Sequence, residues 1–330
     1  MEEDQGEEDG GQGHQGEPSR SAFRRDVLAG LALPQKAIPA RWFYDEAGSR
    51  LFEQITRLPE YYPTRAETEI LAGCGQALAA AVGAGRAVIE FGSGSSAKTP
   101  HLLEAIAPAA YVPIDISAEF LRQSAQALAA RFPGLPVLPV VADFTGPLQL
   151  PGEIDGLPGL GFFPGSTIGN LVPHQAVDLL RSLRAMLGDG AQLLIGLDRI
   201  KDLGLLLAAY DDRDGVTAAF NLNLVDRINR ELEGDIPRAA LRHKVIWNEP
   251  FARIEMHLEA TRAIAFGVAG RRFTMSAGET IHTENSHKYD HRSAAMLLQG
   301  GGWTPVGEWR DALGRFSVFL AAAAAPHIAP

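Results

Sequence analysis

A glycine-rich turn and nearby acidic side chains are the first residues of this sequence that could do chemistry. Residues 87–91 read as a short apolar strand, and a glycine turn at residues 92–94 follows at once. Glycines let the backbone bend sharply and approach a ligand, and amides at the start of a following helix can face that ligand. Acidic residues end three successive apolar runs, at Glu90, Asp115 and Asp143. Together these residues predict a small-molecule site at the ends of parallel strands.

Two cofactors fit such a turn, and the acidic residues distinguish between them. Gly92, Gly94 and Ala97 satisfy the pattern G-x-G-x-x-G/A, and Asp115 follows 23 residues after the first glycine, as in dinucleotide-binding folds. NAD is therefore an alternative. S-adenosylmethionine (SAM) carries a sulfonium and an ammonium and has no pyrophosphate, so acidic strand ends suit it better. Phe144, directly after the third acidic residue, could pack on its adenine. The pattern favours SAM over NAD.

A second polar turn, at residues 164–170, follows the fourth apolar run. In open α/β sheets, ligands lie in the crevice at the carboxyl ends of the strands, which is where this turn would lie. Asn170 can both donate and accept a hydrogen bond, and the glycines of the turn expose backbone groups. The alternative is that Asn170 caps the helix expected from Pro173.

Several tyrosines lie outside the expected sheet, at Tyr44, Tyr61, Tyr62 and Tyr210. A buried tyrosine usually finds a hydrogen-bond partner for its hydroxyl, so each of them could contact a ligand. Each could equally be a packing residue, and spacing alone does not decide between these interpretations.

A late polar segment, residues 283–289, collects Thr, Glu, Asn, Ser, His, Lys and Tyr without core character. His282, His287 and His291 lie in or beside it and raise the question of a metal site. We expect no metal, because cysteine is absent there and these residues read as a turn and the start of a helix.

Alternating strands and helices must position these turns. We expect strands at residues 87–91, 111–116, 137–142, 159–164 and 191–197, and helices at residues 99–106, 118–131 and 173–187. Such alternation predicts an α/β fold with a parallel, Rossmann-like sheet and right-handed crossovers.

The regular alternation of strands and helices does not continue on either side of this section. Before it, we expect a helix at residues 47–58 and another, opened by the capping-box pair Thr64 and Glu67, running to Leu78. After it, the pattern predicts an inserted α+β lobe and then a return to the sheet. The expected helices are 201–208, 217–233 and one from 291, and the expected strands are 244–247, 252–258, 261–266 and a closing hairpin of 304–309 and 315–322.

These patterns predict a division of the chain into three parts. Residues 1–21 are expected to be a disordered acidic tail, because they contain almost nothing apolar. Residues 22–65 and 199–286 would form a substrate-binding lobe. Residues 66–198 and 287–330 would form a SAM-binding domain.

Composition excludes several classes of partner. The net charge is −10, and residues 1–20 account for −6 of it, so the remainder lacks the basic surface that nucleic acids require. No apolar run reaches the roughly 18 residues of a membrane span, and the acidic start does not resemble a signal peptide. Cys74 is the only cysteine, so we expect a cytoplasmic protein without disulfides. We also expect a monomer.

Several segments together resemble the histidine-specific methyltransferase family, the histidine Nα-methyltransferases that make hercynine on the way to ergothioneine. The matching motifs are WFYD at 42–45, LPEYYPTR at 58–65, EFGSG at 90–94, GSTIGN at 165–170, AYDD at 209–212, GVTAAFN at 215–221 and IEM at 254–256. The resemblance covers roughly residues 23–320. It implies a class I SAM-dependent methyltransferase fold and three successive methyl transfers to the α-amino nitrogen of histidine. Another amino acid or a biogenic amine is the alternative acceptor, and an NAD-dependent oxidoreductase is a more distant one.

The resemblance also implies roles for individual residues. The SAM-binding residues would be Glu90, Gly92, Ser93, Gly94, Lys98, Asp115, Asp143 and Phe144. Asn170 and Tyr44 would be catalytic, orienting the substrate's amino group, with Gly165 and Thr167 nearby. Tyr210 would bind the carboxylate. The residues around the imidazole would be Glu284, Ser286, Tyr61 and Met256.

Overall fold

The computed structural model describes residues 20–94, 98–146 and 148–323 of the chain. Residues 1–19 of the expected tail, Ala97 of the glycine pattern and residues 324–330 lie outside the described residues. The expected tail was too long by two residues, because helix α1 (Arg20–Leu31) already begins at Arg20. This helix buries an apolar face at Phe23, Val27 and Leu31, whose spacing puts them on one side of a helix.

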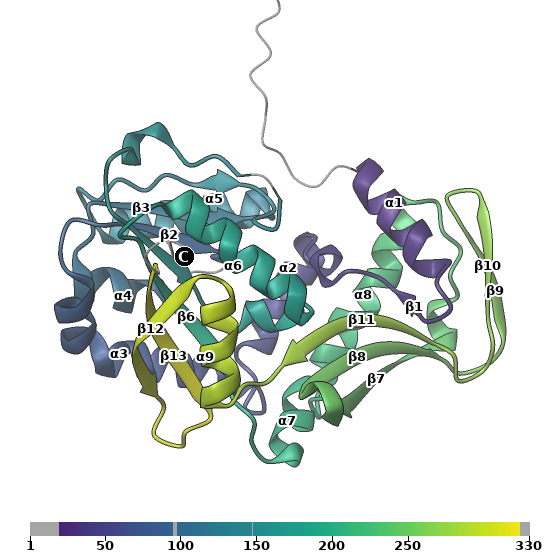
Figure 1. The fold of residues 1–330 in the computed structure, drawn as a ribbon. Coiled ribbons are helices and arrows are strands. Elements are labelled where there is room, and N and C mark those ends of the chain that lie inside the picture. Colours follow the sequence, from purple (N-terminus) through teal and green to yellow (C-terminus); the bar gives the residue numbers. More distant parts are fainter. Residues whose placement is uncertain (1–19, 95–97, 147, 324–330) are drawn as a thin grey trace, which may run out of the picture.

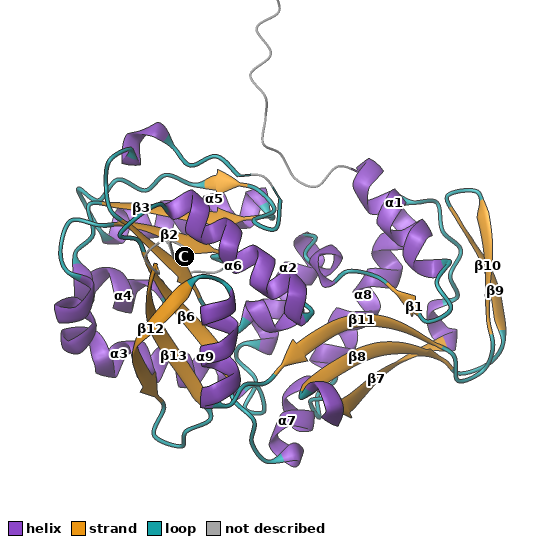
Figure 2. Ribbon diagram, viewed as in Figure 1, coloured by secondary structure: helices purple, strands orange, loops and turns teal. Residues whose placement is uncertain are grey.

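A seven-stranded sheet forms one half of the molecule (Figures 1 and 2). Its order is β12-β13-β6-β5-β2-β3-β4. The parallel strands are β2 (Ala87–Phe91), β3 (Ala110–Asp115), β4 (Val140–Val141), β5 (Gly159–Phe163) and β6 (Gln192–Asp198). The expected hairpin is confirmed as β12 (Trp303–Arg310) and β13 (Phe316–Ala323), and β13 pairs antiparallel to β6. The strand order reverses between β2 and β5, which makes their carboxyl ends the expected place for a ligand.

Helices cover both faces of this sheet. The expected helices are confirmed at their residues as α4 (Thr99–Ile106), α5 (Ala118–Arg131) and α6 (Pro173–Leu187). Side chains alternate across β2, so Val88 packs in one core cluster with α3 (Tyr62–Val82) and α4. Ile89 and Phe91 pack on the other side with α6 and α9 (His291–Gly300). The strand is therefore buried on both faces, with the glycine turn at its end.

A second sheet, of order β1-β11-β8-β7, forms the other half. Its strands are β1 (Lys36–Ala37), β7 (Leu241–Asn248), β8 (Arg253–Ala260) and β11 (Thr280–His287). A separate hairpin is formed by β9 (Ile264–Val268) and β10 (Arg271–Met275), and the helices are α1, α2 (Glu46–Ile55), α7 (Leu203–Tyr210) and α8 (Val216–Glu231). One core cluster joins these helices to the sheet. The predicted division of the chain into a lobe and a domain stays a prediction.

The sequence interpretation was wrong in several places. β10 was not expected, and β11 was expected to be a turn, because its polar residues hid a strand that is defined by pairing with β8. The expected strand 137–142 retains only β4 and a bridge between Tyr111 and Val137. The proposed capping box does not exist, because α3 begins at Tyr62 and the buried Glu67 pairs with Lys98. The other elements shift by a few residues at their ends.

Two of the segments that connect the halves, after β6 and after β11, lie side by side. The Tyr289 amide donates to the Asp198 carbonyl (2.9 Å), and the Ile200 amide donates to the Tyr289 carbonyl (3.1 Å). The end of β6 and the segment after β11 are thereby fixed to each other. No helix within the described residues is both long and apolar enough to cross a membrane.

Candidate functional site

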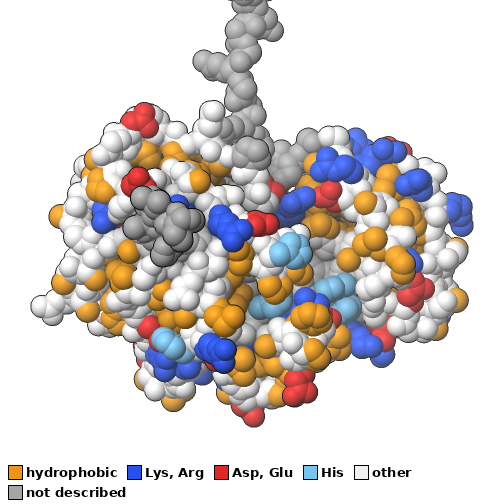
Figure 3. Space-filling view, viewed as in Figure 1, with side chains coloured by type: hydrophobic (Ala, Val, Ile, Leu, Met, Phe, Trp, Pro, Cys, Tyr) orange, Lys and Arg blue, Asp and Glu red, His pale blue; other side chains and the backbone are white. Residues whose placement is uncertain are grey.

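A cavity of about 990 Å³ lies between the two sheets. Its lining includes Gly92 and Asp115 from the ends of β2 and β3, Glu284 from β11, and Tyr44 from the segment before α2. On the face drawn in Figure 3, histidine and charged side chains gather near the middle of the molecule. The cavity therefore brings together residues from segments far apart in the chain.

All of the residues expected to bind SAM border this cavity: Glu90, Gly92, Ser93, Gly94, Lys98, Asp115, Asp143 and Phe144. The turn after β2 wraps around the end of β3, because the Gly92 amide donates to the Ile114 carbonyl (2.9 Å) and the Gly94 amide donates to Asp115 Oδ2 (2.9 Å). Gly92 and Gly94 have φ values of 73° and 50°, a left-handed conformation that favours glycine. Burial raises the pKa of Asp115, although backbone amides oppose that shift.

Asp143 and Phe144 form the next part of this wall. Asp143 Oδ1 accepts from the Thr145 amide (2.9 Å), and Asp143 Oδ2 lies 3.5 Å from the Arg41 guanidinium. The Phe144 ring packs edge-on against Phe163, with 5.4 Å between ring centroids. A carboxylate edge and an aromatic face are thus held next to each other beside the glycine turn.

Glu90 differs from the other two acidic strand ends. It is buried within β2 and accepts hydrogen bonds from Thr99 Oγ1 (2.8 Å) and the Tyr111 hydroxyl (2.5 Å). Burial raises its pKa to about 7, and the two hydrogen bonds oppose the shift. Although it borders the cavity, its carboxylate is also part of the packing that joins β2, β3 and α4.

Glu67 contacts two residues of the cavity lining, Lys98 and Gly165, and these contacts were not expected from the sequence. Its side chain is fully buried, pairs with Lys98 Nζ and accepts from the Gly165 amide (2.9 Å). One carboxylate therefore links Lys98 to the turn at 164–170. From the sequence we expected only a capping role for Glu67, since nothing local indicates a partner 98 residues away.

The turn at 164–170 ends in a short 3-10 helix, η3 (Thr167–Asn170). It brings Asn170 Nδ2 within 3.0 Å of Glu284 Oε1, where the amide donates to the carboxylate. The alternative role for Asn170 was wrong, because Val172 is the N-cap of α6 and no side chain caps that helix. Burial raises the pKa of Glu284 to about 7, while Lys288 and Asn170 oppose the shift.

The other expected substrate residues fall into two groups. Tyr44, Tyr61, Gly165 and Thr167 border the cavity together with Asn170 and Glu284. Tyr210, Ser286 and Met256 do not border it, and each is buried. The Tyr210 hydroxyl lies 2.6 Å from Ser286 Oγ, so these two residues are brought together.

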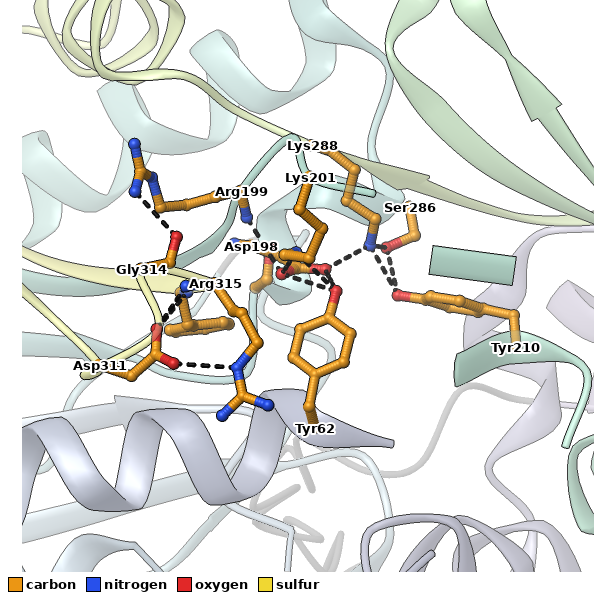
Figure 4. Close-up of polar contacts among 12 residues, drawn as sticks. Tyr62, Asp198, Arg199, Lys201, Tyr210, Ser286, Lys288, Asp311, Gly314 and Arg315 are labelled. Atoms are coloured by element: carbon orange, nitrogen blue, oxygen red, sulfur yellow. Dashed lines mark hydrogen bonds and ion pairs between the residues drawn. The ribbon is translucent and has the colours of Figure 1, made fainter. Parts of the chain in front are cut away.

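A buried charged cluster, drawn in Figure 4, lies next to this pair and was not expected from the sequence. Asp198, at the end of β6, accepts from the Tyr62 hydroxyl (2.8 Å), Lys201 Nζ (2.5 Å) and Lys288 Nζ (2.7 Å). Burial alone would raise the pKa of Asp198, but the two ammonium groups hold it below its usual value. Only the polarity of the segment containing Lys288 could have indicated such a cluster.

The histidines group differently from the expectation. His282 lies with His257 and Glu255, whose possible ligand atoms are within 4.8 Å of one another, rather than with His291. The His257 and His282 rings stack at 4.6 Å, so their in-plane lone pairs do not converge, and Arg253 already pairs with Glu255. We assign no metal to this cluster, and the expectation of a metal-free protein stays a prediction.

Known proteins resemble this chain along almost its whole length. The family described as histidine-specific, SAM-dependent methyltransferases matches residues 23–323. The histidine N-alpha-methyltransferase of Mycolicibacterium smegmatis is 42% identical over 310 residues, which cover 91% of this chain and 94% of that protein. The histidine N-alpha-methyltransferase of Mycobacterium tuberculosis is 41% identical over 308 residues, covering 91% and 95%. Ergothioneine biosynthesis protein 1 of Neurospora crassa is 31% identical over 83% of this chain and 32% of that longer protein.

Proposed function

This chain belongs to the family of histidine-specific, SAM-dependent methyltransferases, and from that premise we propose that it methylates the α-amino nitrogen of L-histidine. Three successive transfers would give hercynine, the trimethylbetaine of histidine, as a step of ergothioneine biosynthesis. The names of the mycobacterial relatives support the acceptor, and the name of the Neurospora relative supports the pathway.

One observation carries the proposal: a single cavity joins the glycine turn and Asp115 on one side to the Asn170–Glu284 pair on the other. A methyl transfer needs the donor and the acceptor in one space, aligned and shielded from water. Such positioning can lower a barrier by about 7–11 kcal/mol. In this cavity the donor would lie beside the glycine turn and Asp115, and the acceptor would lie beside Asn170 and Glu284.

The cofactor wall fits SAM. A Cβ at Gly92 would lie 3.4 Å from the Phe144 ring, so the glycine keeps open the space beside an aromatic face and a carboxylate. Asp115 would bind the ribose hydroxyls, Asp143 and Phe144 would bind the adenine, and Glu90, Ser93, Gly94 and Lys98 would complete the wall. SAM supplies a methyl group that its sulfonium already activates. We therefore propose that the reaction needs no metal.

The acceptor wall would hold histidine by both ends. Asn170 and Tyr44 would orient the amino group, with Gly165 and Thr167 beside them. Glu284 would accept from the imidazole N–H, with Ser286 beyond it and with Tyr61 and Met256 packing around the ring. Tyr210 was expected to bind the carboxylate, but its hydroxyl is buried against Ser286, so we assign it to the ring end instead. We also propose that the protein acts as a monomer in the cytoplasm, where its single cysteine would stay reduced.

Mass spectrometry of the products tests the proposal. Purified protein is incubated with SAM and an equimolar mixture of the twenty amino acids, and a reaction without SAM is the control. We expect histidine alone to gain the mass of three methyl groups. Methylation of a different amino acid would contradict the acceptor, and no methylation despite measurable SAM binding would contradict the transferase activity.

A further inference from the structure

Lys288 is a buried ammonium that the proposed reaction does not use. Its side chain has no exposed area, and it lies directly after β11. Its Nζ donates to Asp198 Oδ2 (2.7 Å), Ser286 Oγ (2.8 Å) and the Tyr210 hydroxyl (2.9 Å), as Figure 4 shows. A lysine ammonium has three hydrogens and no acceptor, so all of its hydrogens are used by these contacts.

The two hydroxyls that Lys288 contacts also bond to each other. Tyr210 and Ser286 are 2.6 Å apart, and burial raises the pKa of Tyr210, so its hydroxyl keeps its proton. The pair has two hydroxyl hydrogens, and the contact between the two oxygens uses one of them. Neither hydroxyl has a further protein partner among the described residues, so one hydrogen is left as a donor.

The position of Ser286 on β11 indicates where that hydrogen points. Side chains alternate along a strand, so Ser286 shares a face with Glu284, two residues earlier. The pairing of β11 with β8 is regular from Glu284 to His287, because its one irregularity lies before Glu284. Ser286 and Glu284 therefore share one face of β11, where Glu284 borders the cavity and Ser286 lies buried beyond it.

We propose that Lys288, anchored by Asp198, is a specificity-determining positioning residue that makes Ser286 a hydrogen-bond donor to the side chain of the acceptor. In this arrangement Lys288 donates to both hydroxyls, Tyr210 donates to Ser286, and Ser286 donates to the ligand. Glu284 beside it accepts. This inference rests on the proposed function and deepens it: the site selects a ring with one N–H and one unprotonated nitrogen, which is the neutral imidazole.

The same cluster contains a matched control. Lys201 also pairs with Asp198 and bonds to Tyr62, but it contacts neither Ser286 nor Tyr210. Asp198 keeps three donors without Lys288, namely Lys201 Nζ, the Tyr62 hydroxyl and the backbone amide of Arg199. Removal of either lysine leaves the carboxylate charged and paired, so the two variants should disturb the fold to a similar degree.

The experiment compares histidine with β-(2-thienyl)alanine, whose ring has a similar size but neither an N–H nor a basic nitrogen. Dissociation constants are measured by calorimetry with S-adenosylhomocysteine present, so that neither amino acid reacts. We expect Lys288→Met to weaken histidine binding by about tenfold or more and to change thienylalanine binding by less than about threefold. Lys201→Met should leave the ratio of the two constants within about twofold of the wild type. An unchanged ratio in Lys288→Met, or an equal loss in Lys201→Met, would overturn the inference.

Two further measurements keep the inference testable if Lys288→Met does not fold. Lys288→Gln retains two N–H donors. Its preference for histidine over thienylalanine should therefore lie between those of the wild type and Lys288→Met. In the wild type, β-(pyrrol-2-yl)alanine has the ring N–H without the second nitrogen, and it should bind about tenfold more weakly than histidine. Equal binding of these two amino acids would overturn the assignment of Ser286 as a donor. A wild-type protein that does not methylate histidine would instead contradict the proposed function.

Discussion

The two walls of the cavity are built in different ways. On the cofactor wall, Asp115 and the glycine turn follow directly from the ends of neighbouring parallel strands, and backbone amides hold Asp115 in place. On the acceptor wall, Asn170 and Glu284 come from segments that are 114 residues apart and meet through their side chains. The cofactor wall is thus a property of the sheet, whereas the acceptor wall depends on how the two sheets pack. We therefore expect substitutions on the acceptor wall to change the substrate without changing the fold.

The largest effect is expected where the two walls meet. Asn170 belongs to the turn of the seven-stranded sheet but bonds to Glu284 of the other sheet. We expect Asn170→Ala to reduce kcat/KM for histidine by about 100-fold, because a small misplacement of the reacting amine is costly. SAM affinity, measured by calorimetry, should stay within about twofold.

Asn248→Ala is the control for this variant, because it also removes an amide that bonds a glutamate, here Glu255 on the opposite face of the four-stranded sheet. It should retain most of the activity. If Asn170→Ala weakened SAM binding as strongly as it reduced turnover, the separation between the walls would be wrong.

On the cofactor wall, we expect Asp115→Ala to raise the dissociation constant of SAM by about thirtyfold, since it removes a buried carboxylate and frees the Gly94 and Ser117 amides. Asp115→Asn keeps one acceptor and should have a smaller effect. Titration calorimetry with SAM measures both. A raised KM for histidine with unchanged SAM affinity would contradict the assignment of Asp115 to the cofactor.

On the acceptor wall, we expect Glu284→Ala to reduce activity on histidine by about tenfold or more and to relax selectivity towards aromatic amino acids. We expect the wild type to disfavour such substrates because an apolar ring offers the Glu284 carboxylate no N–H donor. The measurement is the ratio of the rates on histidine and tryptophan. Unchanged relative rates would remove Glu284 from the acceptor site.

The smallest expected effect is the pH dependence of kcat/KM that Glu284, on the acceptor wall, would cause. The pKa of Glu284 is raised to about 7, so lowering the pH through 7 protonates it and removes its negative charge. The profile of kcat/KM reports groups of the free enzyme, so the wild-type value should fall by about twofold from this group alone between pH 8 and pH 7. Glu284→Gln should lack this component and keep the one from the substrate's own amine. Identical profiles would contradict the prediction.

The sequence predicted the helices and the sheet best where local signals agree with packing. α6 begins at Pro173 and ends before Gly188, and both residues mark helix ends on their own. β11 was missed because its polar side chains are paired with partners from other segments, such as Asn170 and Tyr210. Glu67 fitted a capping pattern, yet its carboxylate is drawn to Lys98 and to the Gly165 amide instead. Local patterns fail where a distant partner supplies the stabilising contact.

By itself, the sequence determined the strand and glycine turn of the cofactor wall and the family to which the chain belongs. These features depend on neighbouring residues, whose periodicity and turn chemistry can be read directly. Only the tertiary structure decided that Asp198, Lys201 and Lys288 form one buried cluster behind Ser286. Buried charges are stable only beside opposite charges and hydrogen-bond partners, and packing of the two sheets brings those partners together.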